Sequence, residues 1–205
     1  MSVHDHEGGR AGSAGVAAAV VAGIVVADQF TKQLAVAKLS PPHIPHEVIG
    51  EYVRFTLTYN PGAAFGMHLG SLSRWIFAGL TLVILGFLLR LFRATPHADA
   101  PLRLSIAAVM GGAIGNLVDR FRSPLGVVDF IDIGVGDVRF WTFNLADAAV
   151  SVGAVCLVIL LWRRDLAHAA HVAAHGAAGG EARPHAVESG PRMDAMDGGA
   201  GPSDR

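Results

Sequence analysis

The stretch RWIFAGLTLVILGFLLRLF, residues 74–92, decides the class of this protein, because it carries no charge between Arg74 and Arg90. A helix of roughly 20 predominantly apolar residues is long enough to cross the hydrocarbon core of a bilayer. The rest of the chain agrees, since 52% of its 205 residues are hydrophobic and 16% are charged. Soluble domains carry about a quarter charged residues. The sequence therefore predicts a membrane protein.

Three further runs are long and apolar enough to span a membrane. They cover residues 14–37, 102–118 and 144–162, and the run at 102–118 is the weakest because its end is polar. With residues 74–92 they predict four transmembrane helices. The one cysteine, Cys156, excludes an internal disulfide and any CxxC pair. It lies in the last run, where we expect a buried, inert thiol.

The arginines predict the orientation of these helices. An even number of spans puts both termini on the same side of the membrane. Residues 90–103 carry three arginines, and Arg163 and Arg164 follow the last span. Positive charge is typical of cytoplasmic loops, so we expect cytoplasmic termini. The rule is not decisive, because seven basic residues between Lys32 and Arg139 then lie outside.

The two ends of the chain differ from its centre. Residues 1–12 and 165–205 lack apolar periodicity, so they cannot bury enough surface to offset chain entropy. We predict that both are disordered and flank a membrane domain at 13–164. The first apolar run also has the length of a signal-peptide core, with cleavage possible at Ala27. Its apolar pattern continues past Asp28, which suits a retained helix.

A small β element is predicted at about residues 44–66, between the first two spans. Val53, Phe55 and Leu57 alternate with polar residues, which is the period of a half-buried strand. The NPG turn that follows breaks the pattern. An ordinary linker hairpin explains the same pattern. We expect a mainly α membrane protein with a small extracytoplasmic β platform at the membrane surface.

Polar side chains gather at the outer ends of the predicted helices. Such groups are costly inside a bilayer and usually face a protein interior or a wet cavity. An ion pair between Asp28 and Lys32 and a network between Asp119 and Arg120 are structural explanations for part of the set. Their shared position nevertheless predicts one site. Its members are Asp28, Lys32, Asn116, Asp119, Arg120, Asp129, Asn144 and Asp147.

Two carboxyl groups in this set are candidates for hydrolytic chemistry. Carboxyls that share one proton can activate water, because the ionised group takes a proton from it while the neutral group polarises a carbonyl. Asp129 and Asp147 fit such a pair. The sequence contains neither an HExxH zinc motif nor a GxSxG nucleophile elbow. If residues 127–132 are extended, Asp132 faces away from Asp129 and stays outside the site.

Four blocks of the sequence resemble the lipoprotein signal peptidases (signal peptidase II), which are bacterial membrane aspartic peptidases. The blocks are DQFTKQLA, YNPGAAFGM, GGAIGNLVDRFRSPLGVVDFIDI and FNLADAAVSVG, in the family's order. They lie between residues 28 and 153. The first block is weak alone, whereas GNLVDR and GVVDFID followed by FNLADA are highly specific.

The resemblance implies an endopeptidase that cuts prolipoproteins before a diacylglyceryl-modified Cys, with Asp129 and Asp147 as catalytic dyad. It implies a multi-pass protein of the bacterial inner membrane, with cytoplasmic termini and an extracytoplasmic active site in contact with membrane lipid. No metal or organic cofactor is expected. The supporting polar shell would be Asp28, Lys32, Asn60, Gly62, Asn116, Asp119, Arg120 and Asn144.

Two other functions remain open from the residues alone. A proton-coupled carrier would also place Asp, Arg and Asn inside its spans, but it needs a path through the membrane, and this cluster lies at one end. A structural membrane subunit would leave the two carboxyls idle. Nucleic-acid binding is not expected, because the formal net charge is −1 and such proteins need a basic surface.

Overall fold

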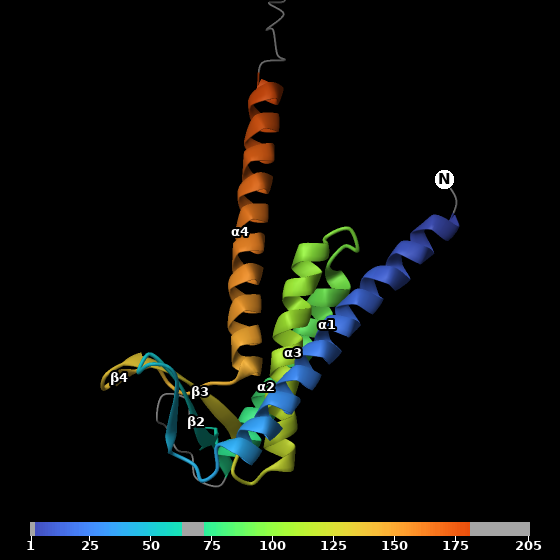
Figure 1. Ribbon diagram of the computed structural model, residues 1–205. Helices are drawn as coiled ribbons and strands as arrows, with labels where there is room; N and C mark the ends of the chain where they lie inside the picture. Colours follow the sequence, from blue (N-terminus) through green and yellow to red (C-terminus); the bar gives the residue numbers. More distant parts are fainter. Residues whose placement is uncertain (1–2, 63–71, 181–205) are drawn as a thin grey trace, which may run out of the picture. The chain divides into compact units, whose positions relative to one another are not determined.

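The computed structural model describes residues 3–62 and 72–180, with side chains for 14–62 and 72–173. Within these residues it has four helices, each with a segment long and apolar enough to cross a membrane. The four predicted spans are therefore confirmed (Figure 1). The helices are α1 (Val3–Lys38), α2 (Ser73–Ala94), α3 (Ala100–Arg122) and α4 (Leu145–Gly180).

The first and last helices are longer than the sequence predicts. Helix α1 begins at Val3 and α4 continues to Gly180, whereas we expected disorder at 1–12 and from 165 onward. Alanine recurs along the extension of α4, and alanine has the highest helix propensity of all residues. The extension of α1 has only Ala11 between Val3 and Gly12, so the same explanation does not apply to it. The domain limits remain a prediction.

A small antiparallel sheet combines two distant segments of the chain. Its strands, in spatial order, are β1 (Pro45–Ile49), β2 (Val53–Asn60), β3 (Val127–Val135) and β4 (Val138–Arg139). The expected β element at 44–66 supplies β1 and β2, and its residues 63–66 lie outside the described part. Thr58 pairs with Asp129 and Arg54 with Asp132, and the register shifts between these pairs. Figure 1 shows β2 and β3 side by side.

An apolar cluster holds the sheet against α1. Ala35 from the last turn of α1 and Leu39, directly after the helix, pack with Leu57 of β2 and with Val128 and Phe130 of β3. All five side chains are buried, and Leu57 is completely so. Burial of such side chains stabilises a fold by roughly 1.5–3 kcal/mol each. The cluster thus fixes the strand that carries Asp129 to the first helix.

Helix α3 is the central helix of the described bundle. In the most apolar part of α3, 56% of the residues are buried, whereas the corresponding share is 11% in each of the other three spans. Its polar end, which weakens the sequence signal for a span, is therefore inside the protein. Cys156 has the opposite environment, since it is exposed. The expectation of a buried thiol is wrong because its face of α4 carries exposed apolar side chains such as Val152 and Ile159.

A close approach between α3 and α4 predicts a large effect for one glycine. A Cβ added to Gly112 would collide with the backbone oxygen of Ala146 and lie 2.8 Å from the Val150 side chain. We expect Gly112→Ala to lower the free energy of unfolding by about 1–3 kcal/mol, the usual cost of overpacking. Gly86→Ala on α2 is the control, because nothing lies within 4 Å of its added Cβ. Equal unfolding temperatures of the two variants in detergent would contradict this packing.

Candidate active site

Lys32 is the centre of a buried polar network. Its Nζ lies 2.9 Å from Asp28 Oδ2 and 2.8 Å from Asp119 Oδ2. It also donates a hydrogen bond of 2.8 Å to Asn116 Oδ1. The Lys32 and Asp28 side chains are 3% and 0% exposed, so each charge depends on its partners for compensation. The network joins α1 to α3 at the end where the sheet lies.

The two carboxylates of this network also fix α4 and β3. Asp28 Oδ1 accepts a hydrogen bond of 2.9 Å from the backbone N–H of Ala146, in the first turn of α4. A carboxylate at this position suits the positive end of the helix dipole. Asp119 Oδ2 accepts a bond of 3.2 Å from the backbone N–H of Val128, next to Asp129. Four elements are therefore held together by two carboxyl groups.

Gln29 also belongs to this network, although it is not among the site residues predicted from the sequence. Its Nε2 donates to Asp119 Oδ1 at 2.9 Å, to the Gly115 carbonyl at 3.2 Å and to Asp28 Oδ2 at 3.3 Å. The available signal was a polar amide inside an apolar run, directly beside Asp28. Such a group is costly in a membrane unless it is hydrogen-bonded.

The amide of Asn144 connects the two candidate catalytic carboxyls. Its Nδ2 donates to Asp129 Oδ1 at 2.7 Å and to Asn116 Oδ1 at 3.0 Å. The Asn116 Nδ2 in turn donates to Asp147 Oδ1 at 2.7 Å. A chain of two amides thus leads from Asp129 to Asp147, and Lys32 holds its middle through Asn116. Asn144 is completely buried.

The local sequence NLAD explains how Asn144 and Asp147 are oriented. Asn144 precedes α4 and accepts a hydrogen bond of 2.9 Å from the backbone N–H of Asp147. Asp147 Oδ2 accepts a bond of 3.2 Å from the backbone N–H of Asn144. This reciprocal pairing at spacing three is a capping box with Asn and Asp in place of the usual Ser or Thr and Glu or Gln. The helix start itself therefore orients both side chains.

Asn60, the last residue of β2, lies beside Asp129. Asn60 hydrogen-bonds to the Asp129 carboxyl through its side chain, and its Oδ1 accepts a bond of 3.0 Å from the backbone N–H of Gly62. Gly62 has a φ of 103°, and an added Cβ would lie 2.7 Å from Phe77 and 2.9 Å from Ser73. Both the backbone conformation and the space require glycine here.

The environment of Asp129 favours its protonated form. Burial, followed by the nearby charge of Asp147, raises the pKa of Asp129 from 3.8 to about 7. Both effects disfavour a second negative charge in a poorly solvated place. Hydrogen bonds from Asn144 and Asn60 and the charge of Lys32 oppose the shift without cancelling it. At neutral pH the pair can therefore hold one proton.

This shift predicts a pH-dependent stability. Between about pH 4 and pH 7 the folded protein keeps a proton on Asp129 that the unfolded chain releases, so the free energy of unfolding falls as pH rises. The full shift corresponds to at most about 4 kcal/mol. We expect Asp129→Asn to flatten the decrease in unfolding temperature from pH 5 to pH 8. Asp137→Asn, exposed in the turn between β3 and β4, is the control, and equal slopes in both variants would contradict the shift.

Asp119 and Arg120, both predicted to lie beside the dyad, contact different partners. The Arg120 Nη1 donates to the Asn116 carbonyl at 3.1 Å, whereas Asp119 pairs with Lys32. Within residues 14–62 and 72–173, Arg120 forms no ion pair with Asp119, although the two are near enough to interact electrostatically. Asp132 lies apart, because its carboxylate contacts Arg139 Nε at 2.7 Å and Thr56 Oγ1 at 3.1 Å.

A comparison with known protein families agrees with this arrangement. The family model described as Signal peptidase (SPase) II matches residues 20–163, which contain three of the predicted spans, most of the first span at 14–37, and both candidate carboxyls. The chain belongs to the signal peptidase II family. The expected enzyme class, a membrane peptidase, is thereby confirmed, and so is the resemblance read from the four sequence blocks.

Relatives of this peptidase carry a consistent name. A lipoprotein signal peptidase of Rhodococcus jostii is 42% identical over 149 residues, which cover 69% of this chain and 70% of the relative. One of Coxiella burnetii is 37% identical over 141 residues, covering 67% of this chain and 84% of the relative. The peptidase also resembles a solved bacterial membrane enzyme with a TM-score of 0.65 and 30% identity, covering 73% of this chain and 88% of the other.

Proposed function

We propose that this peptidase removes signal peptides from prolipoproteins by cutting before a diacylglyceryl-modified Cys, with Asp129 and Asp147 as its catalytic dyad. The names of its relatives support the class of substrate. The observation that carries the mechanism is the amide chain from Asp129 through Asn144 and Asn116 to Asp147. It links two carboxyls that come from a strand and a helix start.

The reaction divides acid and base roles between the two carboxyls. Asp147 accepts hydrogen bonds from two N–H groups, which suits an ionised carboxylate. It takes a proton from water, and the oxygen attacks the scissile carbonyl carbon while protonated Asp129 donates a hydrogen bond to the carbonyl oxygen. The tetrahedral intermediate then collapses, the C–N bond breaks and the departing amine receives the proton held by Asp147. No covalent enzyme intermediate forms.

The remaining site residues are proposed to support this pair. Lys32, Asp28 and Asp119 hold the ends of α1, α3 and α4 and the start of β3 in register. Arg120 lies near enough to interact electrostatically with Asp129 and Asp147 and would stabilise negative charge in the transition state. Asn60 and Gly62 orient Asp129 from the side of β2, and Asn116 and Asn144 orient both carboxyls. The reaction needs no metal or organic cofactor in this scheme.

The proposed location is the bacterial inner membrane, with both termini in the cytoplasm and the site at the outer face. We expect reporter fusions after Arg93 and Arg164 to report cytoplasm and one after Tyr59 to report the outside, because arginines cluster beside the first two positions. A fusion after Arg122 is a further test, since α3 ends beside the site and should report the outside. An outside report from the Arg93 fusion would contradict this topology.

A defined peptide tests the substrate. The purified full chain in detergent is mixed with a synthetic precursor that carries diacylglyceryl on its Cys, and mass spectrometry identifies the products. We expect one cut, immediately before the modified Cys. The same peptide with an unmodified Cys is the control. It should be cut at least 100-fold more slowly, because it loses about 3 kcal/mol of binding energy that the lipid contributes. Equal cleavage of both peptides would contradict recognition of the lipid.

A further inference from the structure

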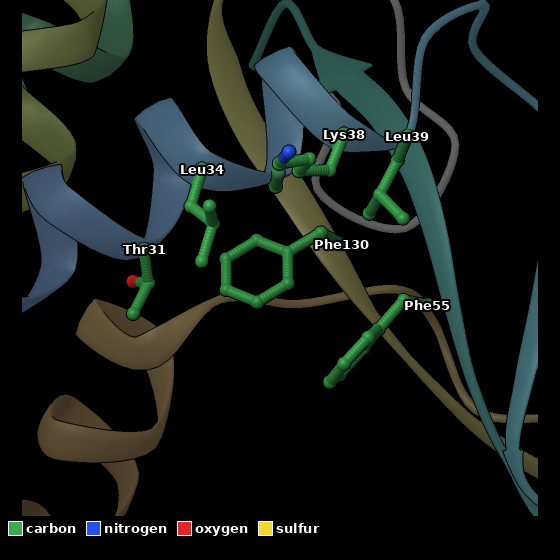
Figure 2. Close-up of a pocket in the computed structure, with 7 residues that line it drawn as sticks. Thr31, Leu34, Lys38, Leu39, Phe55 and Phe130 are labelled. Carbon is green, nitrogen blue, oxygen red and sulfur yellow. The ribbon is translucent and has the colours of Figure 1, made fainter.

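A groove lies between α1 and the sheet, on the opposite side of β3 from the Asp129 carboxyl. We name it the α1 groove; it has a volume of about 250 Å³ and is lined by Thr31, Leu34, Ala35, Lys38, Leu39, Phe55 and Phe130 (Figure 2). Successive side chains of a strand point to opposite faces, so Phe130 lines the groove while Asp129 faces the amide chain. The groove is therefore separate from the proposed dyad.

The lining of the groove suits hydrocarbon. Figure 2 shows the Phe130 ring between Leu34 and Phe55, and the two phenylalanine rings meet edge to face at 6.0 Å. The Thr31 hydroxyl is already used, because it donates to the Ala27 carbonyl at 2.9 Å. Lys38 is the one charged side chain in the lining. A ligand of this groove is thus apolar along its length and has an anionic group at one end.

The face of α1 that leads to the groove is exposed and apolar. Val26, Phe30 and Leu34 are 67%, 65% and 48% exposed, and with Lys38 they form a row of side chains four residues apart. Such residues lie above one another on a helix, over roughly 18 Å from first to last. The row belongs to the span Ala14–Lys38. It ends in a cation at the point where the span ends.

The charge of Lys38 decides which lipid is expected. None of the ion pairs within residues 14–62 and 72–173 involves Lys38, so its ammonium is available to an external anion. A phospholipid presents a phosphate at the height where its acyl chains begin, which matches a lysine above an apolar row. The diacylglyceryl group of the proposed substrate has no phosphate and gains nothing from this lysine.

We propose that the α1 groove binds one acyl chain of an anionic membrane phospholipid whose phosphate contacts Lys38. The volume of about 250 Å³ is below the roughly 300 Å³ at which pockets for drug-sized ligands begin. It suits part of one unbranched chain, with the rest of the chain along Phe30 and Val26. The bound chain packs against Phe130 and so against the strand that carries Asp129. This inference concerns a lipid of the membrane and does not depend on the proposed reaction.

Native mass spectrometry tests this proposal without any cleavage assay. The full chain is released from nanodiscs of equal parts phosphatidylglycerol and phosphatidylcholine, and retained lipids are counted. We expect one phosphatidylglycerol per chain, with a preference of about fivefold or more over phosphatidylcholine, since a basic residue near an anionic surface contributes about 1 kcal/mol. Lys38→Gln should remove the preference. Leu34→Trp, which fills the groove, should reduce retention of both lipids.

Arg122→Gln is the matched control, because Arg122 is exposed at the end of α3 and does not line the groove. It should retain phosphatidylglycerol like the unsubstituted protein. All variants are compared only at unfolding temperatures within a few degrees of each other, and Leu34→Phe replaces Leu34→Trp if the larger side chain lowers that temperature further. Equal retention of the two lipids by the unsubstituted protein overturns the role of Lys38. Unchanged retention after Leu34→Trp or Leu34→Phe overturns the role of the groove.

Discussion

Asp129→Asn and Asp147→Asn are each expected to reduce turnover of a lipidated precursor by about 10²–10⁴-fold, the usual contribution of general acid–base catalysis. Each substitution preserves the size of the side chain and removes its ability to gain or lose a proton. Asp129→Asn leaves the scissile carbonyl without its acid, and Asp147→Asn leaves water without its base. The measurement is kcat/KM of purified variants that have the unsubstituted protein's unfolding temperature.

The double variant separates a dyad from two independent residues. Groups that act as one unit show strongly non-additive losses, so Asp129→Asn with Asp147→Asn should be little slower than the slower single variant. Asp132→Asn is the matched control, since Asp132 is on the same strand but pairs with Arg139. It should keep turnover within about tenfold. Near-normal turnover by either single dyad variant would remove that residue from the mechanism.

Lys32→Met is expected to give the largest loss of stability, about 3–5 kcal/mol. The substitution leaves the carboxylates of Asp28 and Asp119 buried without their cation, and an unpaired buried charge is strongly destabilising. Lys38→Met is the control on the same helix, because Lys38 is exposed and surface changes usually stay within about 0.5 kcal/mol. Thermal or denaturant unfolding in detergent measures both.

A second substitution identifies the cause of the loss. If unpaired charge destabilises Lys32→Met, then adding Asp119→Asn should recover part of the lost stability, although Asp119→Asn alone is destabilising. A substitution that is destabilising alone but stabilising beside Lys32→Met indicates direct coupling between the two residues. Additive losses in the double variant would show that Lys32 stabilises the protein through packing alone.

The sequence predicts the parts of this fold that depend on composition and local spacing. Four spans follow from apolar length, and the capping pair Asn144 and Asp147 follows from a spacing of three. The spacing of four residues between Asp28 and Lys32 also predicts their ion pair, which is found at 2.9 Å. Each of these features involves residues close in the chain.

The features that the sequence does not predict depend on how distant elements are rotated. Lys32 pairs with Asp119 across 87 positions, whereas the sequence suggested Arg120 as the partner of Asp119. That choice depends on the rotation of α3 against α1, which no local pattern specifies. The exposure of Cys156 has the same origin, because an apolar run alone does not say which face meets other helices. The shift in register between Phe55 and Thr58 depends on pairing with a strand about 70 residues away.

The pH dependence of kcat/KM for a lipidated precursor tests the central claim most directly, namely that Asp129 and Asp147 share one proton when they activate water. With the pKa of Asp129 raised to about 7, kcat/KM should reach a plateau in weak acid and fall tenfold per pH unit above about pH 7, as the pair loses its shared proton. Return to pH 6 should restore full activity, which excludes irreversible unfolding as the cause. A rate that continues to rise through pH 9 would contradict the account, because it would require a base other than this carboxyl pair.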